Sequence, residues 1–496
     1  MGVKVTKSSF SKEEFSQFGD ILDEQLDVLK DVIRSPDFGD KNLKLGAELE
    51  MYLVDDAFDV CPKSEALLKA LDDPQYQAEI NAYNLELNLS AHDIKGKPYT
   101  KMLTEMRTKT ERLEKVAANL GINIMPVGIL PTLRQEHLTK DYMTKELRYQ
   151  VMDSQLASQR GQAFEINING EENVKINCDA VSVEGANTSF QVHMMVDHDR
   201  FADIFNAAQL TMPLVTAVAA NSGILLGHRT WDETRVALFK QSLDTRIKGA
   251  VPWQEPARVS FGQGWVKKDS WELFAEAVAL FNPLLPVMHQ ENAAEVWQKG
   301  LLPKFHELCL HLGTSWPWHR PVYCNHNSGH VRIEFRAIPA GPTSIDMVAN
   351  AAFAMGLAVG LADHIEDYIA AIPFRFAEYN FYRAAQDGLD AVVLWPCKKG
   401  HLTEETPVTE VIERLFPFAE KGLKSLGVDH SDIDSFLAVI AERLDKGITG
   451  ARWQKNTHRH FENKYNKQEA SRMLTALYIE NARSALPVSQ WGQEWS

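Results

Sequence analysis

The sequence lacks the features that mark several large classes of protein. It has no dense Lys/Arg tract, and its formal net charge is −15 over 496 residues, which argues against a nucleic-acid-binding protein. Its five cysteines are odd in number and have no CxxC spacing. We therefore expect neither a disulfide framework nor a zinc site, and a reducing cytoplasmic location. Any negatively charged substrate must be met by local arginines or by a metal ion.

Long apolar segments are also missing. The most apolar run, Met347 to Leu361, is interrupted by Asn350 and is shorter than the roughly 20 residues that a membrane span needs. Met1 to Asp20 lacks the apolar segment of a signal peptide. We expect no membrane partner, and we expect Met347 to Leu361 to form a buried helix.

No low-complexity linker, compositional break or repeat of fixed period divides the chain. Ser11 and Glu14 make a capping box before an apolar stripe, which predicts an amphipathic helix from Ser11 to Arg34. We expect residues 1–40 to hold this helix against the core, residues 41–396 to form the main domain, and residues 397–496 to be a helical extension of the same domain.

What the chain does contain is a set of alternating segments. In Lys44 to Val54 the odd-numbered residues are apolar and lie on one strand face, whereas Glu48, Glu50 and Tyr52 lie on the other. Two neighbouring carboxylates repel each other, and partial burial disfavours their charged forms. The pattern indicates either a solvated outer face or a hard cation such as Mg²⁺ between the carboxylates.

Three further segments share this design, at residues 84–89, 187–197 and 330–338. Joined to the first in one antiparallel sheet, they would bury their aliphatic faces under helices and leave a concave polar face. That face would carry, with Glu79 at its rim, the side chains Glu48, Glu50, Glu86, Gln191, His193, Arg332, Glu334 and Arg336.

Each of these groups has an ordinary interpretation when taken alone. His193 is typical of a hydrogen-bonded strand histidine, and Arg332, Glu334 and Arg336 could form a structural ion-pair ladder. Together, the carboxylates imply roughly two or three Mg²⁺ ions, with Mn²⁺ as an alternative, and the arginines imply phosphate. Metal between carboxylates and nucleotide phosphates is the arrangement of phosphoryl transfer.

The remaining segments are mostly helical by pattern. Thr132 to Asp153, with Arg148 and Tyr149, looks polar and mobile, and the stretch after the helix at 201–220 looks like a long surface loop. Helices are expected at 65–71, 99–120, 343–369 and 375–391, over most of 265–309, and through the remainder to Ser496.

Six motifs in order resemble the glutamate–cysteine ligase type 2 family of carboxylate–amine ligases, relatives of glutamine synthetase. They lie between Gly46 and Gln454: LGAELEM, the pair Glu79 and Glu86, EGANTSFQVHMMVD, ANSGILLG followed by Glu233-Thr234-Arg235, RIEFR, and NFYRAAQDGLDA. Each motif is weak alone, whereas six in the family's order are specific.

The resemblance implies an α+β fold, with a curved antiparallel β-sheet funnel backed by helices and a helical C-terminal region. It implies an ATP-dependent ligase, in which ATP phosphorylates a carboxylate and an amine then attacks the acyl phosphate. The metal ligands implied are Glu48, Glu50, Glu79, Glu86, Glu334, and Gln191 or His193. The catalytic residues implied are Glu50, Arg235 and Arg336, and the nucleotide- or substrate-binding residues implied are His193, Asn221, Ser222, Arg246, Arg332 and Arg336.

Three positions depart from the family's pattern. Gln191 stands where many members have His, Gly223 replaces a usual Pro, and Pro339 with Ala340 replaces an Asp after Arg336. The substrates are therefore expected to be amino acids or peptides, without assuming glutamate and cysteine. A homodimer is expected, and the alternatives are a guanidino-kinase-like phosphotransferase on the same sheet and a non-catalytic nucleotide-binding relative.

Overall fold

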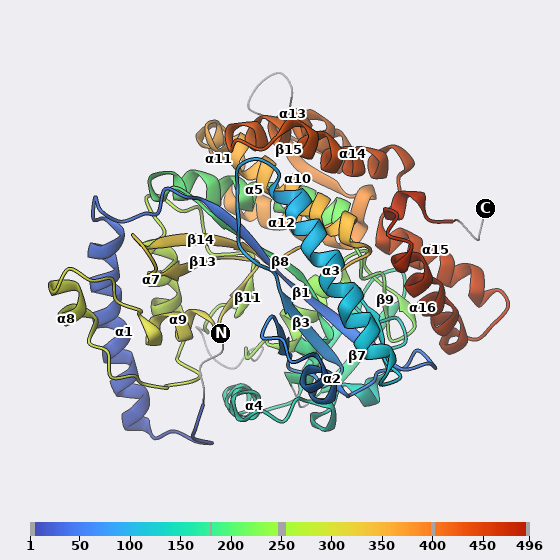
Figure 1. Ribbon diagram of the computed structural model, residues 1–496, viewed down its shortest axis with the longest axis horizontal. Coiled ribbons are helices and arrows are strands. Elements are labelled where there is room, and N and C mark those ends of the chain that lie inside the picture. Colours follow the sequence, from blue (N-terminus) through green and yellow to red (C-terminus); the bar gives the residue numbers. More distant parts are fainter. Residues whose placement is uncertain (1–4, 179–180, 247–253, 398–401, 493–496) are drawn as a thin grey trace.

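The computed structural model describes residues 5–178, 181–246, 254–397 and 402–492 (Figure 1). Its helices are α1 Lys12–Ile33, α2 Ser64–Leu71, α3 Pro98–Ala118, α4 Leu147–Arg160, α5 Phe201–Ala219, α6 Thr234–Ser242, α7 Trp271–Leu280, α8 Ala293–Gln298, α9 His306–Leu312, α10 Ser344–Ala362, α11 Ile365–Ala371, α12 Phe374–Asp387, α13 Val408–Ser425, α14 His430–Lys446, α15 Gly450–Glu462 and α16 Lys467–Arg483.

The strands are short apart from the first. They are β1 Lys44–Val54, β2 Tyr76–Ala78, β3 Asn84–Asn88, β4 His92–Asp93, β5 Asn123–Met125, β6 Phe164–Asn169, β7 Asn173–Cys178, β8 Phe190–Met195, β9 Ile224–Leu225, β10 His228–Arg229, β11 Val259–Ser260, β12 Trp316–Pro317, β13 His319–Cys324, β14 His330–Phe335, β15 Val392–Pro396 and β16 Thr403–Pro407.

The central sheet contains all four alternating segments that the sequence predicts. Its order is β13-β14-β8-β1-β3-β2, with β4 and β5 also paired to β1, and the sheet is open rather than closed into a barrel. The ladders that join β1 to β3 and β8, and β8 to β14, are antiparallel. The α+β class with a large antiparallel sheet is therefore confirmed.

Register sets which polar side chains meet. Glu50 of β1 lies opposite Glu86 of β3, Glu48 lies opposite Gln191 of β8, and His193 lies opposite Glu334 of β14. Because side chains alternate between the two faces of a strand, these pairs share one face of the sheet.

The other face of the sheet belongs to the core. Leu45, Leu49 and Met51 of β1 have no exposed area, and burying such a side chain stabilises a fold by about 1.5–3 kcal/mol. Helices α5 and α10 pack against each other behind the sheet, and α13 and α14 cover α10 on its outer side (Figure 1).

Two segments, His198–Ala219 and Ser344–Ala362, are long and apolar enough to cross a membrane by length and composition. Both are mostly buried inside the fold: in each segment, 89% of the most apolar 18-residue window is buried. The buried helix expected around Met347 to Leu361 is thus present as α10.

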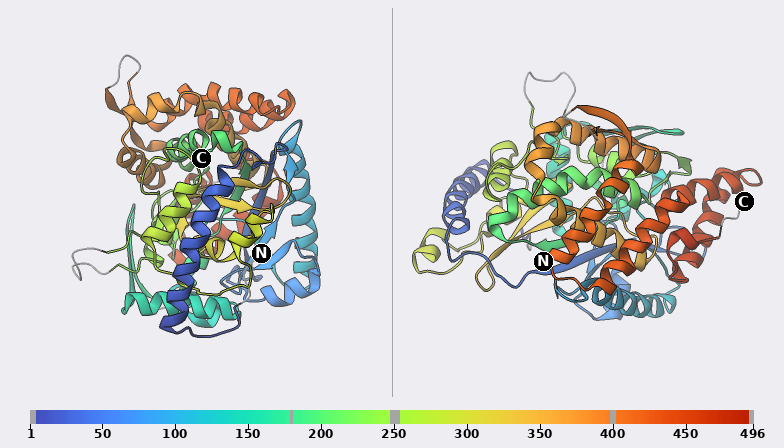
Figure 2. Two further views of the ribbon diagram at one scale, coloured as in Figure 1. Left: turned by 90° about the vertical axis from the view of Figure 1, so that its left-hand side faces the viewer. Right: turned by 90° about the horizontal axis from the view of Figure 1, so that it is seen from above.

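Helix α1 has the predicted capping box at Ser11 and Glu14. It lies beside α7, α8 and α9, at the end of the molecule opposite α15 and α16 (Figures 1 and 2). Gln25 donates a hydrogen bond to the buried carboxylate of Glu307, and Arg34 pairs with Asp269. These contacts hold α1 on the layer that faces the polar side of the sheet.

Several predictions of local structure were wrong. Thr132 to Asp153 is ordered, because Tyr149, Met152 and Asp153 on α4 are buried. The expected surface loop after α5 contains α6, whose Arg235 is almost wholly buried. Residues 265–309 are broken into α7, α8 and the start of α9, the helix at 343–369 ends at Ala362 before α11, and residues 397–496 include strand β16 as well as helices.

Candidate active site

The polar face of the sheet forms one wall of a cavity of about 510 Å³, which is within the size range of small-molecule sites. Strands β1, β3 and β8 supply Glu48, Glu50, Glu86 and Gln191, and Glu79 follows β2. The facing wall comes from α4 and from the segment around α9. It contributes Arg148, Tyr149, Met152, Leu285, Lys304, His306, Cys309, Leu310, Gly313, Thr314 and Trp316.

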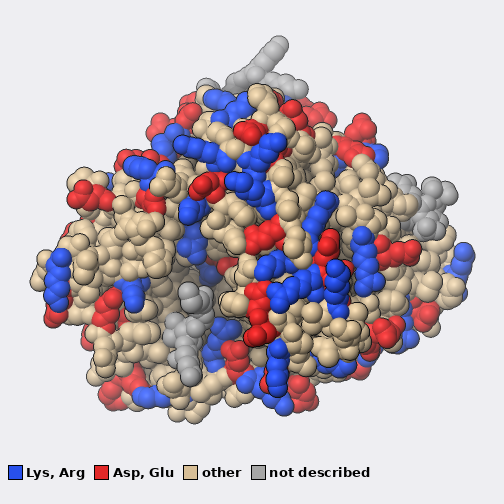
Figure 3. Space-filling model, viewed as in Figure 1, with Lys and Arg blue, Asp and Glu red and all other residues tan. Residues whose placement is uncertain are grey.

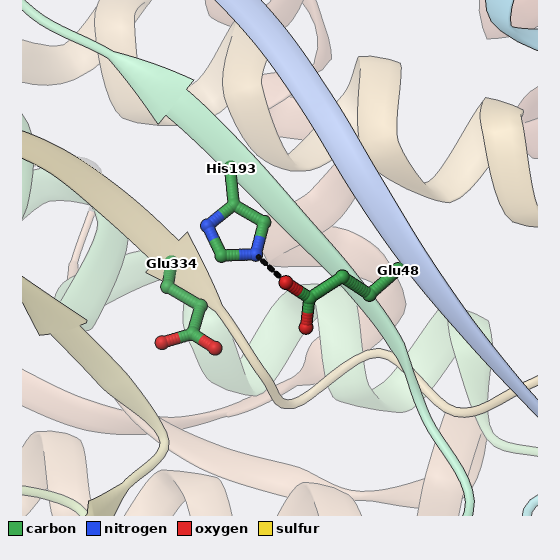
Figure 4. A group of neighbouring side chains, drawn as sticks. All are labelled: Glu48, His193 and Glu334. Atoms are coloured by element: carbon green, nitrogen blue, oxygen red, sulfur yellow. Dashed lines mark ion pairs between the residues drawn. The ribbon is translucent and has the colours of Figure 1, made fainter. Parts of the chain in front are cut away.

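A first group of potential metal ligands comprises Glu48, His193 and Glu334 (Figure 4). One ligand atom from each lies within 4.8 Å of the others. Glu48 lines the cavity, whereas His193 and Glu334 are only 8% and 1% exposed. His193 Nε2 lies 3.1 Å from Glu48 Oε1. Burial raises the pKa of Glu48, but the basic neighbours His193 and Arg320 together bring that pKa below its ordinary value.

The other nitrogen of His193 argues for a positioning role. Arg332 Nε donates a hydrogen bond to His193 Nδ1 at 3.0 Å, so a neutral ring carries its proton on Nε2, the nitrogen nearer to Glu48. Metal-binding histidines usually donate their second N–H rather than accept a bond there. In this arrangement the His193 ring lies between Arg332 and Glu48.

A second group comprises Glu50, Glu79 and Glu86, again with one oxygen from each within 4.8 Å of the others. Burial raises the pKa of Glu50 above its ordinary value. Burial, and then the neighbouring Glu86, raise the pKa of Glu79 well above its ordinary value. Burial together with Glu48 and Glu50 raises the pKa of Glu86 to about 7. A divalent cation here would relieve both the burial of charge and the mutual repulsion.

Glu50 is fixed in place by its neighbours. Its Oε2 accepts hydrogen bonds from the Ser189 backbone N–H and hydroxyl, at 2.7 and 3.0 Å. Its Oε1 accepts a bond of 2.7 Å from the Gln191 amide. The Gln191 carbonyl in turn accepts a bond of 2.5 Å from Arg336 Nη1. Gln191 thus links Glu50 to Arg336.

A cationic corner adjoins the first group. Glu334 accepts hydrogen bonds from Arg320 through Nε and Nη2, and from Arg336 Nη1 at 2.9 Å. Burial opposes ionisation of Glu334, but the two guanidinium groups hold its pKa far below the ordinary range. The cavity is therefore positive at the β13–β14 end and negative at the β1–β3 end.

Three residues expected in the site lie behind it. Arg235 donates hydrogen bonds to Glu233 and to the carbonyls of Arg336 and Ala337, and its guanidinium stacks on Trp318. Asn221 donates to Ala340 O and Tyr478 Oη, and Ser222 Oγ accepts from the Arg235 backbone. None of the three lines the cavity. Their hydrogen bonds join the segment after α5 and the start of α6 to the chain that follows β14.

Arg246 also lies outside the cavity. Its guanidinium forms a bidentate pair with Asp244, at 2.7 and 2.8 Å. It lines a different cavity of about 1030 Å³, along with Arg160, Glu165 and Gln241. The cavity with the acidic groups is the smaller of the two, and its donor chemistry rather than its size makes it the candidate site.

The structure gives physical reasons for two of the three departures from the family's pattern, at Gly223 and at Pro339 with Ala340. A Cβ at Gly223 would lie 3.0 Å from Ala451 O, and the Gly223 N–H donates to Gln454, so a proline there would clash with α15 and lose a hydrogen bond. Pro339 pairs with Ser189 in an isolated bridge, and Ala340 O binds Asn221. These residues close the strand end in place of an acidic side chain.

Sequence reasoning missed several cavity residues. Arg320 lies on β13, whose HRPVYC sequence has apolar residues on both faces, so polarity gave no alternating signal although burial alternates. Glu184 lies on a 3₁₀ turn, Val181–Ala186, where a period of two does not apply. Burial and the neighbouring Glu50 raise the pKa of Glu184 to about 8. Lys304 and His306 were assigned to an ordinary helix.

One solved structure shows the same fold at low sequence identity, and a second gives a weaker match. A glutamate–cysteine ligase from Francisella tularensis in complex with AMP matches with a TM-score of 0.50 and 11% identity, over 90% of each chain. A bifunctional glutathione synthetase from Pasteurella multocida matches with a TM-score of 0.48 and 11% identity, over 94% of this chain and 55% of that one. A search of curated protein sequences found no match.

The family comparison covers most of the chain. The sequence profile of glutamate-cysteine ligase family 2 matches residues 44–476, a range that includes every strand of the central sheet and both carboxylate groups. The chain belongs to glutamate-cysteine ligase family 2 and is a carboxylate–amine ligase.

Proposed function

We propose that this ligase uses ATP and Mg²⁺ to form an amide bond through an acyl phosphate. The γ-phosphoryl group of ATP passes to a carboxylate oxygen of the acid, and ADP leaves. The amine nitrogen then attacks the acyl carbon, phosphate leaves and the nitrogen loses a proton. The observation that carries the proposal is one cavity lined by four carboxylates, Glu48, Glu50, Glu79 and Glu86, together with Arg320 and Arg336.

The residues fit hard divalent cations. The second group offers three carboxylates with raised pKa values, and oxygen ligands of this kind suit Mg²⁺ or Mn²⁺. Glu50, Glu79 and Glu86 would hold one ion, and Glu48 would hold another with Glu334. Bound ions would neutralise charge on the phosphates during transfer.

Glu48 and Glu50 would therefore serve separate ions. They are two apart on one strand, yet each belongs to a different carboxylate group. Different neighbours orient them, since His193 contacts Glu48 while Ser189 and Gln191 hold Glu50. A nucleotide-bound structure with both carboxylates on one ion, or on none, would contradict this assignment.

We propose amino acids or peptides as substrates, a cytoplasmic location and a homodimer. Both signs of charge line the cavity, including the acidic Glu184 and the basic Arg148 and Lys304, which suits zwitterionic substrates. On the face shown in Figure 3, basic and acidic side chains are interspersed, in keeping with small-molecule substrates in preference to nucleic acid.

The test is a substrate panel. The purified chain is incubated with Mg·ATP and paired acids and amines, and products are scored by mass. We expect a product equal to acid plus amine less water, with equimolar ADP and phosphate, only when both are present. ADP release that never depends on an acid would refute the proposal. A stable phosphorylated product without free phosphate would instead indicate a kinase.

A further inference from the structure

His306 lies on the cavity wall that faces the sheet. It is the first residue of α9, and it lines the cavity together with Cys309, Leu310 and Gly313 of the same segment. Neither ring nitrogen of His306 has a hydrogen-bond or ion-pair partner in the part of the chain that the structure describes. Both nitrogens are therefore available to a ligand in the cavity.

The ring of His306 is held in place by His289. The two rings stack with their centroids 4.3 Å apart and their planes at 16°, which fixes the plane of His306 and leaves its polar edge free. His289 in turn donates its backbone N–H to Glu307 Oε1 at 2.5 Å, and its Nδ1 lies 3.3 Å from the same oxygen. The orientation of His306 thus depends on Glu307.

The carboxylate of Glu307 is held by helix α1. Glu307 is 1% exposed, and its Oε2 accepts a hydrogen bond of 2.6 Å from Gln25 Nε2, while Gln25 Oε1 accepts one of 3.0 Å from the Leu308 N–H. A buried carboxylate that loses such a donor pays a desolvation penalty. Because the family profile begins at residue 44, the support for His306 starts in a helix that the profile does not cover.

The ligation proposed above needs a group that accepts the proton of the amine. The two carboxylate groups are assigned to cations, and protonated arginine and lysine side chains have no lone pair to offer. Burial raises the pKa of Cys309 to about 12 and the pKa of Tyr149 above its ordinary value. Burial and the neighbouring Glu50 raise the pKa of Glu184 to about 8. Each of these three side chains therefore mostly holds its own proton at neutral pH.

His306 differs from these groups because its ring is neutral. Burial, and then His289, lower the pKa of His306 below its ordinary value. Among the charged groups that face it, Lys304 also lowers this pKa, whereas Glu291 and Glu307 raise it. A neutral imidazole with a free lone pair is a common proton acceptor in enzymes.

We propose that His306 accepts the proton of the attacking amine, and that α1 positions His306 through Glu307 and His289. The inference rests on the proposed function. The amine nitrogen bonds to the acyl carbon, the bond from that carbon to the phosphate oxygen breaks, and phosphate leaves with the electron pair. The excess proton on the nitrogen passes to a ring nitrogen of His306, and from there to solvent.

The test supplies two nucleophiles to the wild-type chain and to His306→Gln. One is the amine that supports turnover, and the other is hydroxylamine, which is mostly uncharged at neutral pH and attacks acyl phosphates without a base. We expect His306→Gln to lower kcat for amide formation roughly 100-fold, as for loss of a general base. Hydroxamate formation should be unchanged, because the acyl phosphate still forms.

The pH dependence gives a second readout. His306 accepts a proton only while its ring is neutral, so the wild-type amide rate should fall as pH drops through the lowered pKa of His306. Dividing by the hydroxamate rate removes the titration of the metal-binding carboxylates. Comparison with His306→Gln, which should lack this fall, removes the titration of the amine itself.

The matched control is His311→Gln. His311 lies on the same helix but outside the cavity, where it is 2% exposed and its Nε2 lies 3.0 Å from Ala277 O. This variant should change thermal stability and neither of the two rates.

Gln25→Met tests the positioning by α1. It keeps His306 but removes the side-chain donor to Glu307, so the amide rate should fall roughly 10-fold, as for loss of one such hydrogen bond, while the hydroxamate rate is unchanged. If His306→Gln fails to fold, the same two rates in Gln25→Met decide.

Equal loss of amide and hydroxamate in His306→Gln would make His306 a structural residue and overturn the inference. A normal amide rate in that variant would also overturn it, and unchanged rates in Gln25→Met would overturn the positioning by α1. In each case the wild-type chain still forms amide. A wild-type chain that forms neither amide nor hydroxamate would instead defeat the proposed function itself.

Discussion

At the residue scale, several interactions of the site meet at Glu50. It belongs to the second carboxylate group, accepts three hydrogen bonds, and is linked through Gln191 to Arg336. Its neighbour two positions away, Glu48, depends on a different set of contacts. The two carboxylates can therefore be tested separately.

Replacing Glu50 by Gln should reduce kcat by more than about 100-fold, because an amide cannot offset the charge of a divalent cation. Steady-state rates at saturating ATP and Mg²⁺ check this. Glu276→Gln is the control, since burial also raises the pKa of Glu276, to about 7, but it lies outside the cavity. Near-normal turnover in Glu50→Gln would refute its role.

Arg336→Ala should abolish turnover while leaving the fold intact. Arg336 binds Glu334 and Gln191, and its removal leaves the Glu334 carboxylate with Arg320 as its remaining guanidinium partner. Rates and circular dichroism measured together check this prediction. A folded variant with a normal rate would show that Arg336 has no part in the chemistry.

His193→Gln tests the positioning role. Because His193 orients Glu48 and is itself held by Arg332, we expect the apparent Mg²⁺ affinity to fall by roughly 10- to 100-fold, with kcat restored at saturating Mg²⁺. Titration of activity against Mg²⁺ gives both quantities. A kcat that stays low at saturation would make His193 a metal ligand after all.

At the scale of elements, the alternation of apolar and polar residues located the strands, because one face of each strand is buried. It could place Glu48, Glu50, Glu86 and Glu334 on one surface. It could not find Arg320, since Val322 and Cys324 share its face of β13, so polarity does not alternate along this strand although burial does. Nor could it show that Arg336 lines the cavity whereas Arg235 does not. Burial of a helix residue behind the sheet depends on packing between distant segments.

The helix layer behind the sheet depends on close approach of α10 and α13. A Cβ at Gly360 would lie 1.9 Å from Phe418 O, so we expect Gly360→Ala to destabilise the protein by about 1–3 kcal/mol. Gly19 of α1 has no atom within 4 Å of such a Cβ. Gly19→Ala should therefore stabilise it by about 0.5–1 kcal/mol.

Denaturant unfolding measures both changes. Both glycines lie inside helices, so both replacements gain helix propensity. A stability change of opposite sign at Gly360 therefore reports the contact between α10 and α13. Equal stability of Gly360→Ala and the wild type would show that the two helices can separate without loss.

At the scale of the whole molecule, the acidic cavity makes stability depend on pH and on metal. Glu86 and Glu184 have folded pKa values of about 7 and about 8, above those of an unfolded chain. Between about pH 4.5 and 8 these two side chains therefore bind more protons in the folded than in the unfolded state, and their contribution to stability falls as pH rises.

Mg²⁺ should offset that loss of stability, and protons should compete with Mg²⁺ for the carboxylates. We expect a larger rise in Tm on adding Mg²⁺ at pH 8 than at pH 6, measured by thermal unfolding in matched buffers. A rise independent of pH, or largest at low pH, would place the cation away from these carboxylates.

The central claim is that a carboxylate is activated by phosphorylation in this cavity. The most direct measurement uses the acid that supports turnover, labelled with ¹⁸O in its carboxylate, with Mg·ATP and the amine. An acyl phosphate transfers one carboxylate oxygen to the released phosphate, so we predict phosphate carrying one ¹⁸O for each amide formed. Unlabelled phosphate alongside normal amide formation would contradict the account.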